Sequence, residues 1–181
     1  MQNLKENYQK NIAPKLKEEL KVANIQAVPR LVKITINSSS KDFKNDKDFL
    51  AKTKTWLTAI TGQVPSETRA KTSIAAFNLR QGEVVGLKIT LRGNRMYDFL
   101  EKLISIVLPR LKDFQGINRH NFDKQGNYTL GLAEQIVFPE VEYDKIGRIQ
   151  GLEITISTSA KDPQSSLALL LSLGMPFTKE N

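Results

Sequence analysis

The stretch that decides the fold is Leu31-Val32-Lys33-Ile34-Thr35-Ile36-Asn37, in which apolar and polar side chains alternate. Successive side chains of a β-strand point to opposite faces, so this period of two predicts a strand with one buried and one polar face. We expect Val32, Ile34 and Ile36 on the buried face and Lys33, Thr35 and Asn37 on the polar face. Residues 84–92 repeat the pattern, with Lys88, Thr90 and Arg92 on the polar side.

Further elements follow on either side of these two strands. Short strands are predicted over residues 65–69, 128–132 and 152–158. Helices are predicted at 4–20 with a kink near Pro14, at 47–61 after the N-cap Asp46, at 94–108, and after Asp162. Strands and helices do not alternate strictly. The pattern indicates an α+β protein with a single antiparallel or mixed sheet of about five strands, helices packed on one face and a long basic loop.

Charge is divided unevenly along the 181 residues, which we expect to form a single domain. Residues 1–95 hold 18 Lys and Arg against 8 Asp and Glu, and residues 96–181 hold 9 against 11. A basic half of this kind favours a polyanion as partner, and the acidic half favours a protein. No cysteine, apolar span or signal-like N-terminus is present, which favours the cytoplasm and no membrane contact.

The sequence offers little for catalysis. His120 is the only histidine, and we interpret it as a solvated loop residue because no nucleophile motif accompanies it. Three acids, Glu140, Glu142 and Asp144, would share one face if they lay on a strand. They could hold Mg²⁺, but an exposed acidic contact patch is the better interpretation. We therefore predict no enzyme activity, no metal site and no cofactor.

A long basic loop separates two predicted strands. Residues 68–82 carry Arg69, Lys71 and Arg80 without an acid, and a simple hairpin needs only a few residues. The length therefore indicates a function, such as lying along a nucleic-acid backbone. Phe77 is either a hydrophobic anchor that folds the loop onto itself or a platform for base stacking; we favour the anchor, since a single aromatic makes a poor platform.

Three classes of function remain open on these residues. A sheet face with cations, hydroxyls and amides suits RNA phosphates and ribose 2′-hydroxyls, although a merely solvated sheet face would look similar. An RNA-binding or RNA-modifying protein on a similar α+β scaffold is the alternative, but one histidine and no cysteine give it little support. A protein adaptor that uses only the acidic half would leave the basic half unexplained.

The order and spacing of several short segments resemble the bacterial large-subunit ribosomal protein L5 family, the carriers of 5S ribosomal RNA. The segments that carry the resemblance are Val28-Pro29-Arg30, Lys33–Asn37, Ile60–Pro65, Ile89–Tyr97, Leu108-Pro109-Arg110, Asp113-Phe114, Gly126-Asn127-Tyr128, Glu134–Glu140 and Gly174-Met175-Pro176-Phe177. They span residues 28 to 177. The resemblance implies a structural constituent of the large ribosomal subunit, in the cytoplasm.

The resemblance also implies partners and site residues. Contacts with 5S and large-subunit ribosomal RNA would involve Lys33, Asn37, Gln63, Thr68, Thr90 and Arg92. The loop would contact P-site transfer RNA through Arg69, Lys71, Thr72, Ser73, Phe77, Asn78 and Arg80. A bridge to a protein of the small-subunit head would involve Glu140, Glu142 and Asp144, which agrees with the charge division.

Several positions depart from the family pattern. The usual glycine-bearing turn is Ser38-Ser39-Ser40, Thr72 and Asn78 stand where basic residues are usual, and Gln115 and the pair Lys124-Gln125 replace other family residues. Because Thr72 and Asn78 each remove a phosphate partner, we hypothesise a weaker and less salt-dependent loop contact.

Overall fold

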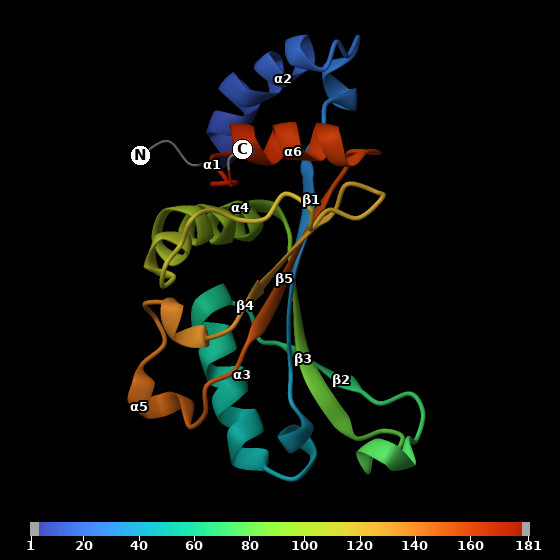
Figure 1. Ribbon diagram of the computed structural model, residues 1–181, viewed down its shortest axis with the longest axis vertical. Coiled ribbons are helices and arrows are strands. Elements are labelled where there is room, and N and C mark those ends of the chain that lie inside the picture. Colours follow the sequence, from blue (N-terminus) through green and yellow to red (C-terminus); the bar gives the residue numbers. More distant parts are fainter. Residues whose placement is uncertain (1–3, 179–181) are drawn as a thin grey trace. The chain divides into compact units, whose positions relative to one another are not determined.

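Five strands form one open antiparallel sheet in a computed structural model that describes residues 4–178, apart from the side chains of residues 144 and 145 (Figure 1). The strand order is β2-β3-β1-β5-β4. The strands are β1 Leu31–Ser39, β2 Ser66–Arg69, β3 Val84–Leu91, β4 Tyr128–Leu132 and β5 Leu152–Thr158. The α+β fold and its strands are confirmed.

Five of the six α-helices in the described chain lie where the sequence predicts helices; the helix at residues 143–146 was not predicted, and the α-helical part of the predicted 94–108 ends at Lys102. They are α1 Leu4–Asn7, α2 Ala13–Glu19, α3 Lys47–Thr61, α4 Gly93–Lys102, α5 Tyr143–Ile146 and α6 Pro163–Ser172. The Asp46 carboxylate accepts a hydrogen bond from Phe49 N at 2.8 Å and caps α3, which ends at Gly62 with φ of +66°. The predicted kink is a π-helical turn, η1 Tyr8–Ile12, directly before α2, which has Pro14 in its first turn.

Shorter helical turns complete the described chain. They are the 3₁₀ turns η2 Ile25–Ala27, η3 Lys41–Lys44, η4 Ala75–Phe77, η6 Leu108–Arg110 and η7 Gln135–Val137, and the π-turn η5 Leu103–Val107. No helix within residues 4–178 is both long and apolar enough to cross a membrane.

The chain falls into two compact units, which we describe separately. The first comprises residues 4–34, 91–130 and 155–178 of the described part. Its core includes Leu16, Leu100 and Leu169, all fully buried. Tyr8 Oη donates a hydrogen bond to the Pro29 carbonyl at 2.8 Å, and burial raises the pKa of Tyr8 to about 12.

The second unit comprises residues 35–90 and 131–154 and holds most of the candidate site. Helix α3 lies along the strands of this unit in Figure 1. Its buried Leu57 belongs to the same core as Leu87, Ile89 and Ile154 from the strands. One face of this part of the sheet is therefore covered, and the residues that alternate with the core form the other face. Whether the units together are the single predicted domain stays a prediction.

One expectation from the strand pattern is wrong, and one condition that the pattern set is not met. Val32 is 45% exposed, and Leu31 is buried in its place, because the buried positions of β1 run 31, 34, 36 and 38 rather than strictly every second residue. The acids near residue 142 do not lie on a strand. Glu142 is instead the residue before α5, so strand alternation does not set which way these side chains point.

Candidate nucleic-acid interface

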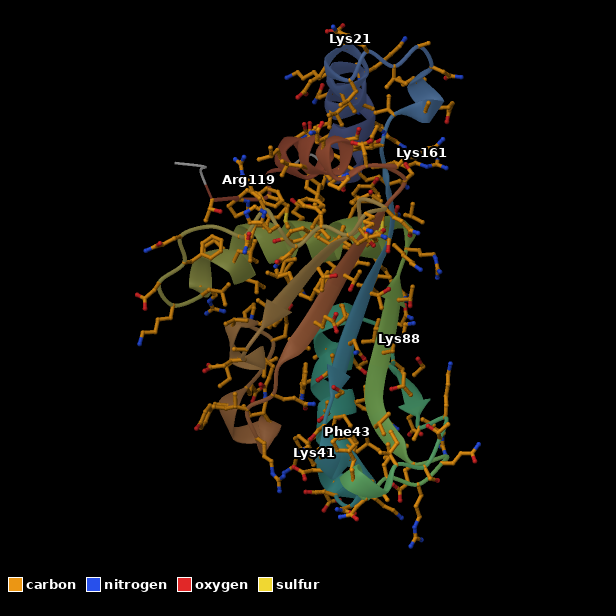
Figure 2. The ribbon with its side chains drawn as sticks, turned by 45° about the vertical axis from the view of Figure 1, so that its right-hand side comes forward. Lys21, Lys41, Phe43, Lys88, Arg119 and Lys161 are labelled. Carbon is orange, nitrogen blue, oxygen red and sulfur yellow. The ribbon has the colours of Figure 1, made fainter. Side chains whose placement is uncertain are left out.

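The pairing of β2 with β3 decides which side chains reach the open face of the second unit. Ser66 lies opposite Lys88, and Thr68 lies opposite Gly86. Residues directly opposite each other in an antiparallel pair project from the same face. Lys88 is exposed and projects away from β3 (Figure 2), so Ser66 and Thr68 share its open face.

The neighbouring strand β1 adds an amide to the same unit. Asn37 is half-buried and alternates with the buried Ile36 and Ser38. Thr90 in β3 is also half-buried, and its carbonyl accepts a hydrogen bond from Gln63 Nε2 at 3.5 Å. Polar groups of four predicted residues, Asn37, Gln63, Thr68 and Thr90, thus belong to one unit.

Lys33 and Arg92, the other two predicted residues, belong to the first unit. Lys33 is half-buried in β1, and Arg92 is exposed in extended backbone directly before α4. Glu153 in β5 is exposed and lies between the buried Leu152 and Ile154, so it points to the uncovered side of the sheet. Among the described strand residues it is the one acid on that side. Apart from Glu153, the uncovered strand positions of the second unit named above, Asn37, Thr68, Lys88 and Thr90, are cationic or polar.

A close approach of three chain segments explains Gly86 in the middle of β3. A Cβ at this position would lie 2.8 Å from Thr68 Oγ1 and 3.2 Å from the Ser38 carbonyl oxygen. Only glycine fits at this separation. The absence of a Cβ at Gly86 therefore lets Thr68 of β2 and Ser38 of β1 lie close to β3 at this position.

Glu67 lies on the opposite face from Thr68 and forms two ion pairs. Its carboxylate is 2.6 Å from Lys54 Nζ of α3 and 2.9 Å from an Arg69 guanidinium nitrogen. The hydrogen bond from Lys54, with the contribution of Arg69, holds the pKa of Glu67 below its ordinary value. Arg69 also donates to the Gly82 carbonyl at 3.3 Å, so it braces the base of the loop. The i, i+2 spacing of Glu67 and Arg69 on a predicted strand could have indicated the ion pair, but nothing in the spacing indicated the bond to Gly82.

The loop after β2 is organised by its own hydrogen bonds. Backbone bonds join Ala70 to Glu83 at 2.9 Å and pair Ile74 with Leu79. Between them, Asn78 adopts the left-handed conformation with φ of +49°. Asparagine tolerates this conformation better than a long basic side chain, which gives a backbone reason for the departure at Asn78.

The predicted loop residues are exposed. Lys71, Thr72, Ser73, Phe77, Asn78 and Arg80 all lie at the surface, and the Ser73 hydroxyl accepts a hydrogen bond from Gln81 N at 3.0 Å. Phe77 is 66% exposed, so it is not the buried anchor that we favoured. It lines a cavity together with Lys41 and Lys44, two residues that the sequence analysis did not single out.

The serines that replace the family's glycine-bearing turn hold the end of β1. Ser38 is buried, and its hydroxyl donates to the Gly151 carbonyl at 3.0 Å. The Ser40 hydroxyl accepts from Asp42 N at 3.2 Å and caps η3. Hydrogen bonds of the serine side chains thus hold the chain at the end of β1, where the family usually has a turn that depends on the backbone freedom of glycine.

A buried glutamine joins the chain on the two sides of the acidic segment, residues 140–144, through partners that lie beyond it in the sequence. Gln135 is fully buried; its Nε2 donates to the Arg148 carbonyl at 2.7 Å, and its Oε1 accepts from Gln150 N. Downstream, Glu140 and Glu142 are exposed and line a cavity of about 570 Å³ with Trp56 of α3. The side chain of Asp144 lies outside the described residues.

No catalytic or metal arrangement emerges among the described residues. His120 is exposed, with only its backbone N–H bonded to Asn118 Oδ1 at 2.9 Å. Within the part of the chain that the structure describes, no group of three or more histidines, cysteines and acids could hold a metal ion.

Comparison with known proteins decides the family. The model described as ribosomal protein L5 matches residues 24–80, and the model that describes the C-terminus of the same ribosomal family matches residues 84–177. The chain belongs to the ribosomal protein L5 family. The large ribosomal subunit protein uL5 of Microcystis aeruginosa is 49% identical over 176 residues, which cover 97% of this chain and 98% of the relative. The uL5 protein of Chloroflexus aurantiacus is 51% identical over 174 residues, with 96% and 97% covered.

Membership of the L5 family confirms the resemblance seen in the sequence. This L5 protein is a structural constituent of the large ribosomal subunit, not an enzyme, and it associates with ribosomal RNA. Its predicted location, the cytoplasmic ribosome, is confirmed by the same membership.

Proposed function

We propose that this L5 protein binds 5S ribosomal RNA through the uncovered side of its sheet. The observation that carries the proposal is the β2–β3 register, which directs Lys88 and Thr68 to the open face and Glu67 to the other. Cations neutralise phosphates, while hydroxyl and amide groups bond ribose 2′-hydroxyls. Asn37, Gln63 and Thr90 of the second unit extend these contacts. Lys33 and Arg92 of the first unit are assigned to RNA contacts from the family resemblance.

Titration with 5S RNA at several salt concentrations tests this proposal. Lys88→Ala should lower the affinity and reduce the slope of log K against log salt by about 1, as expected for one lost phosphate contact. Lys52→Ala is the matched control. Lys52 is exposed on α3 of the same unit, and its replacement by alanine removes the same charge. Equal losses in both variants, or equal affinity for random RNA of the same length, would refute the proposal.

We also propose that the loop contacts P-site transfer RNA. Its exposed cations Lys71 and Arg80 support phosphate contacts, whereas Arg69 is shared with Glu67. The contact has fewer cationic partners than is usual because of Thr72 and Asn78, so it should be weaker and less salt-dependent. Transfer-RNA binding to ribosomes that carry Lys71→Ala with Arg80→Ala should fall; unchanged binding would count against this role.

We propose, third, that the acidic segment contacts a basic protein of the small-subunit head. Glu140 and Glu142 border a partly apolar cavity, which suits a protein partner better than a nucleic acid. Asp144 is assigned to the same contact from the family resemblance. Glu142→Gln should slow subunit association at low salt, since rim charges act mainly on association rates. Glu153→Gln, an equal charge change on the sheet, should not; the same slowing in both would refute the assignment.

A further inference from the structure

A cavity of about 350 Å³ lies beside the loop in the second unit. Its apolar lining comes from Phe77 and Leu79 of the loop and from Val84 and Val85 at the start of β3. The volume falls at the lower end of the range of about 300–1,000 Å³ that small-molecule sites occupy. The cavity can therefore hold a single planar group rather than an extended chain.

Phe77 is held in place although two thirds of its surface is exposed. It ends the turn η4, and its backbone N–H donates to the Ile74 carbonyl at 3.2 Å. The next residue, Asn78, is left-handed, and its carbonyl accepts a hydrogen bond from Lys44 Nζ. An exposed aromatic ring on a fixed backbone loses little conformational freedom when a flat ligand covers it.

The cavity border is cationic. Lys41 and Lys44 of η3 line it, and no acid among the described residues does. The acid between them, Asp42, is 2.6 Å from a guanidinium nitrogen of Arg148. Glu83, just before β3, accepts a hydrogen bond from Arg80 N at 3.0 Å. The charge of Asp42 is therefore balanced by Arg148, which leaves the two lysines that line the cavity to attract an anion.

An apolar aromatic wall with two cations at its border fits a nucleotide. The base would cover the ring of Phe77, and the adjoining phosphates would meet the lysine ammonium groups. An acidic peptide with an aromatic side chain is the rival. The exposed cations Lys71 and Arg80 in the same loop favour RNA, because they extend the cationic surface in the way that a continuous phosphate backbone needs.

We infer that this cavity receives one unpaired nucleobase of a structured RNA, with Phe77 against the base and Lys41 and Lys44 against its phosphates. The inference rests on the proposed RNA-binding function and adds to it a base contact that phosphate binding alone does not require. Removing the nucleobase from the RNA while its phosphates stay in place should therefore lower the affinity.

The test uses the full chain and three RNA hairpins with the same stem: one with a bulged adenosine, one with an abasic site at the bulge, and one fully paired. By fluorescence anisotropy, Phe77→Ala should weaken binding of the bulged hairpin about 5- to 150-fold, the span expected for one base–aromatic stack. Phe77→Trp should retain it. The abasic hairpin should bind the wild type about as weakly as the bulged hairpin binds Phe77→Ala.

Other results would overturn the inference. These are a change of less than about twofold in Phe77→Ala, equal binding of the bulged and abasic hairpins, or displacement of the bulged hairpin by an equal concentration of an acidic peptide that contains phenylalanine. Thermal unfolding of each variant, followed by circular dichroism, shows whether the variant is folded. If Phe77→Ala is not folded, the test uses Phe77→Trp, which should bind the bulged hairpin more tightly than the abasic hairpin.

Binding of 5S RNA by the wild type, measured in parallel, separates the two hypotheses. If the wild type prefers 5S RNA and the bulge has no effect, only the nucleobase inference fails. If 5S RNA binds no better than random RNA, the proposed function fails, whatever the hairpins show.

Discussion

Replacing Gln135 by leucine should destabilise the second unit although leucine is the more apolar residue. The buried side-chain amide accepts a hydrogen bond from Gln150 N and donates one to the Arg148 carbonyl. Leucine makes neither bond. A buried N–H left without a partner costs about 1–3 kcal/mol, and loss of the bond to the part-buried carbonyl adds about 0.5–1.5 kcal/mol. We expect the free energy of unfolding to fall by about 2–4 kcal/mol.

Urea denaturation followed by tryptophan fluorescence measures this loss. Trp56 is the only tryptophan, and it is 5% exposed within α3 of the same unit. Its emission should change when that unit unfolds. The midpoint should move to lower urea with an unchanged slope, since the surface exposed on unfolding stays the same. Gln81→Leu, at an exposed position of the same unit, is the control and should shift stability by no more than about 0.5 kcal/mol. Equal stability of Gln135→Leu and the wild type would refute the reasoning.

Three further predictions concern strand packing and titration. Gly86→Ala should lower the free energy of unfolding by about 1–3 kcal/mol because the new Cβ would meet Thr68 Oγ1 at 2.8 Å, and adding Thr68→Ala should recover part of the loss in thermal melts. Glu67 contributes stability that is present above its ordinary pKa and lost as the pH falls through its lowered folded value, so Glu67→Gln should flatten the acid limb of a stability–pH curve; an unchanged limb would contradict the ion pairs. Burial raises the pKa of Tyr8 and of Tyr128 to about 12, so stability should fall between about pH 10 and 12 as these groups ionise in the unfolded chain. The part of the tyrosinate absorbance that Tyr8→Phe and Tyr128→Phe remove should rise together with loss of structure rather than before it.

Local patterns were sufficient to predict the elements. The alternation of β3 placed Leu87, Ile89 and Leu91 on the buried side, and all three are buried. Asp46 and Gly62 marked the two ends of α3 correctly. These features depend on neighbours in the chain, because strand periodicity and helix capping act over a few residues.

Side-chain contacts, one local and one long-range, changed the interpretation of individual site residues. Arg69 counted from the sequence as a free cation of the loop, yet it pairs with Glu67. Phe77 was expected to be buried and is exposed beside Lys41 and Lys44. The Glu67–Arg69 pair is local, because residues i and i+2 of a strand share a face. The position of Phe77 beside the two lysines does not follow from spacing along the chain, because it depends on which segments fold back against the loop.

The sequence by itself determined the α+β class, the order of the strands along the chain, the division of charge and the family. These properties depend on the composition of the chain and on sequence patterns that repeat every few residues. Tertiary structure decided which charges face outward and which neutralise each other. The β2–β3 register turns Lys88 to the open face and Glu67 toward Lys54, and a shift by one residue would exchange those faces.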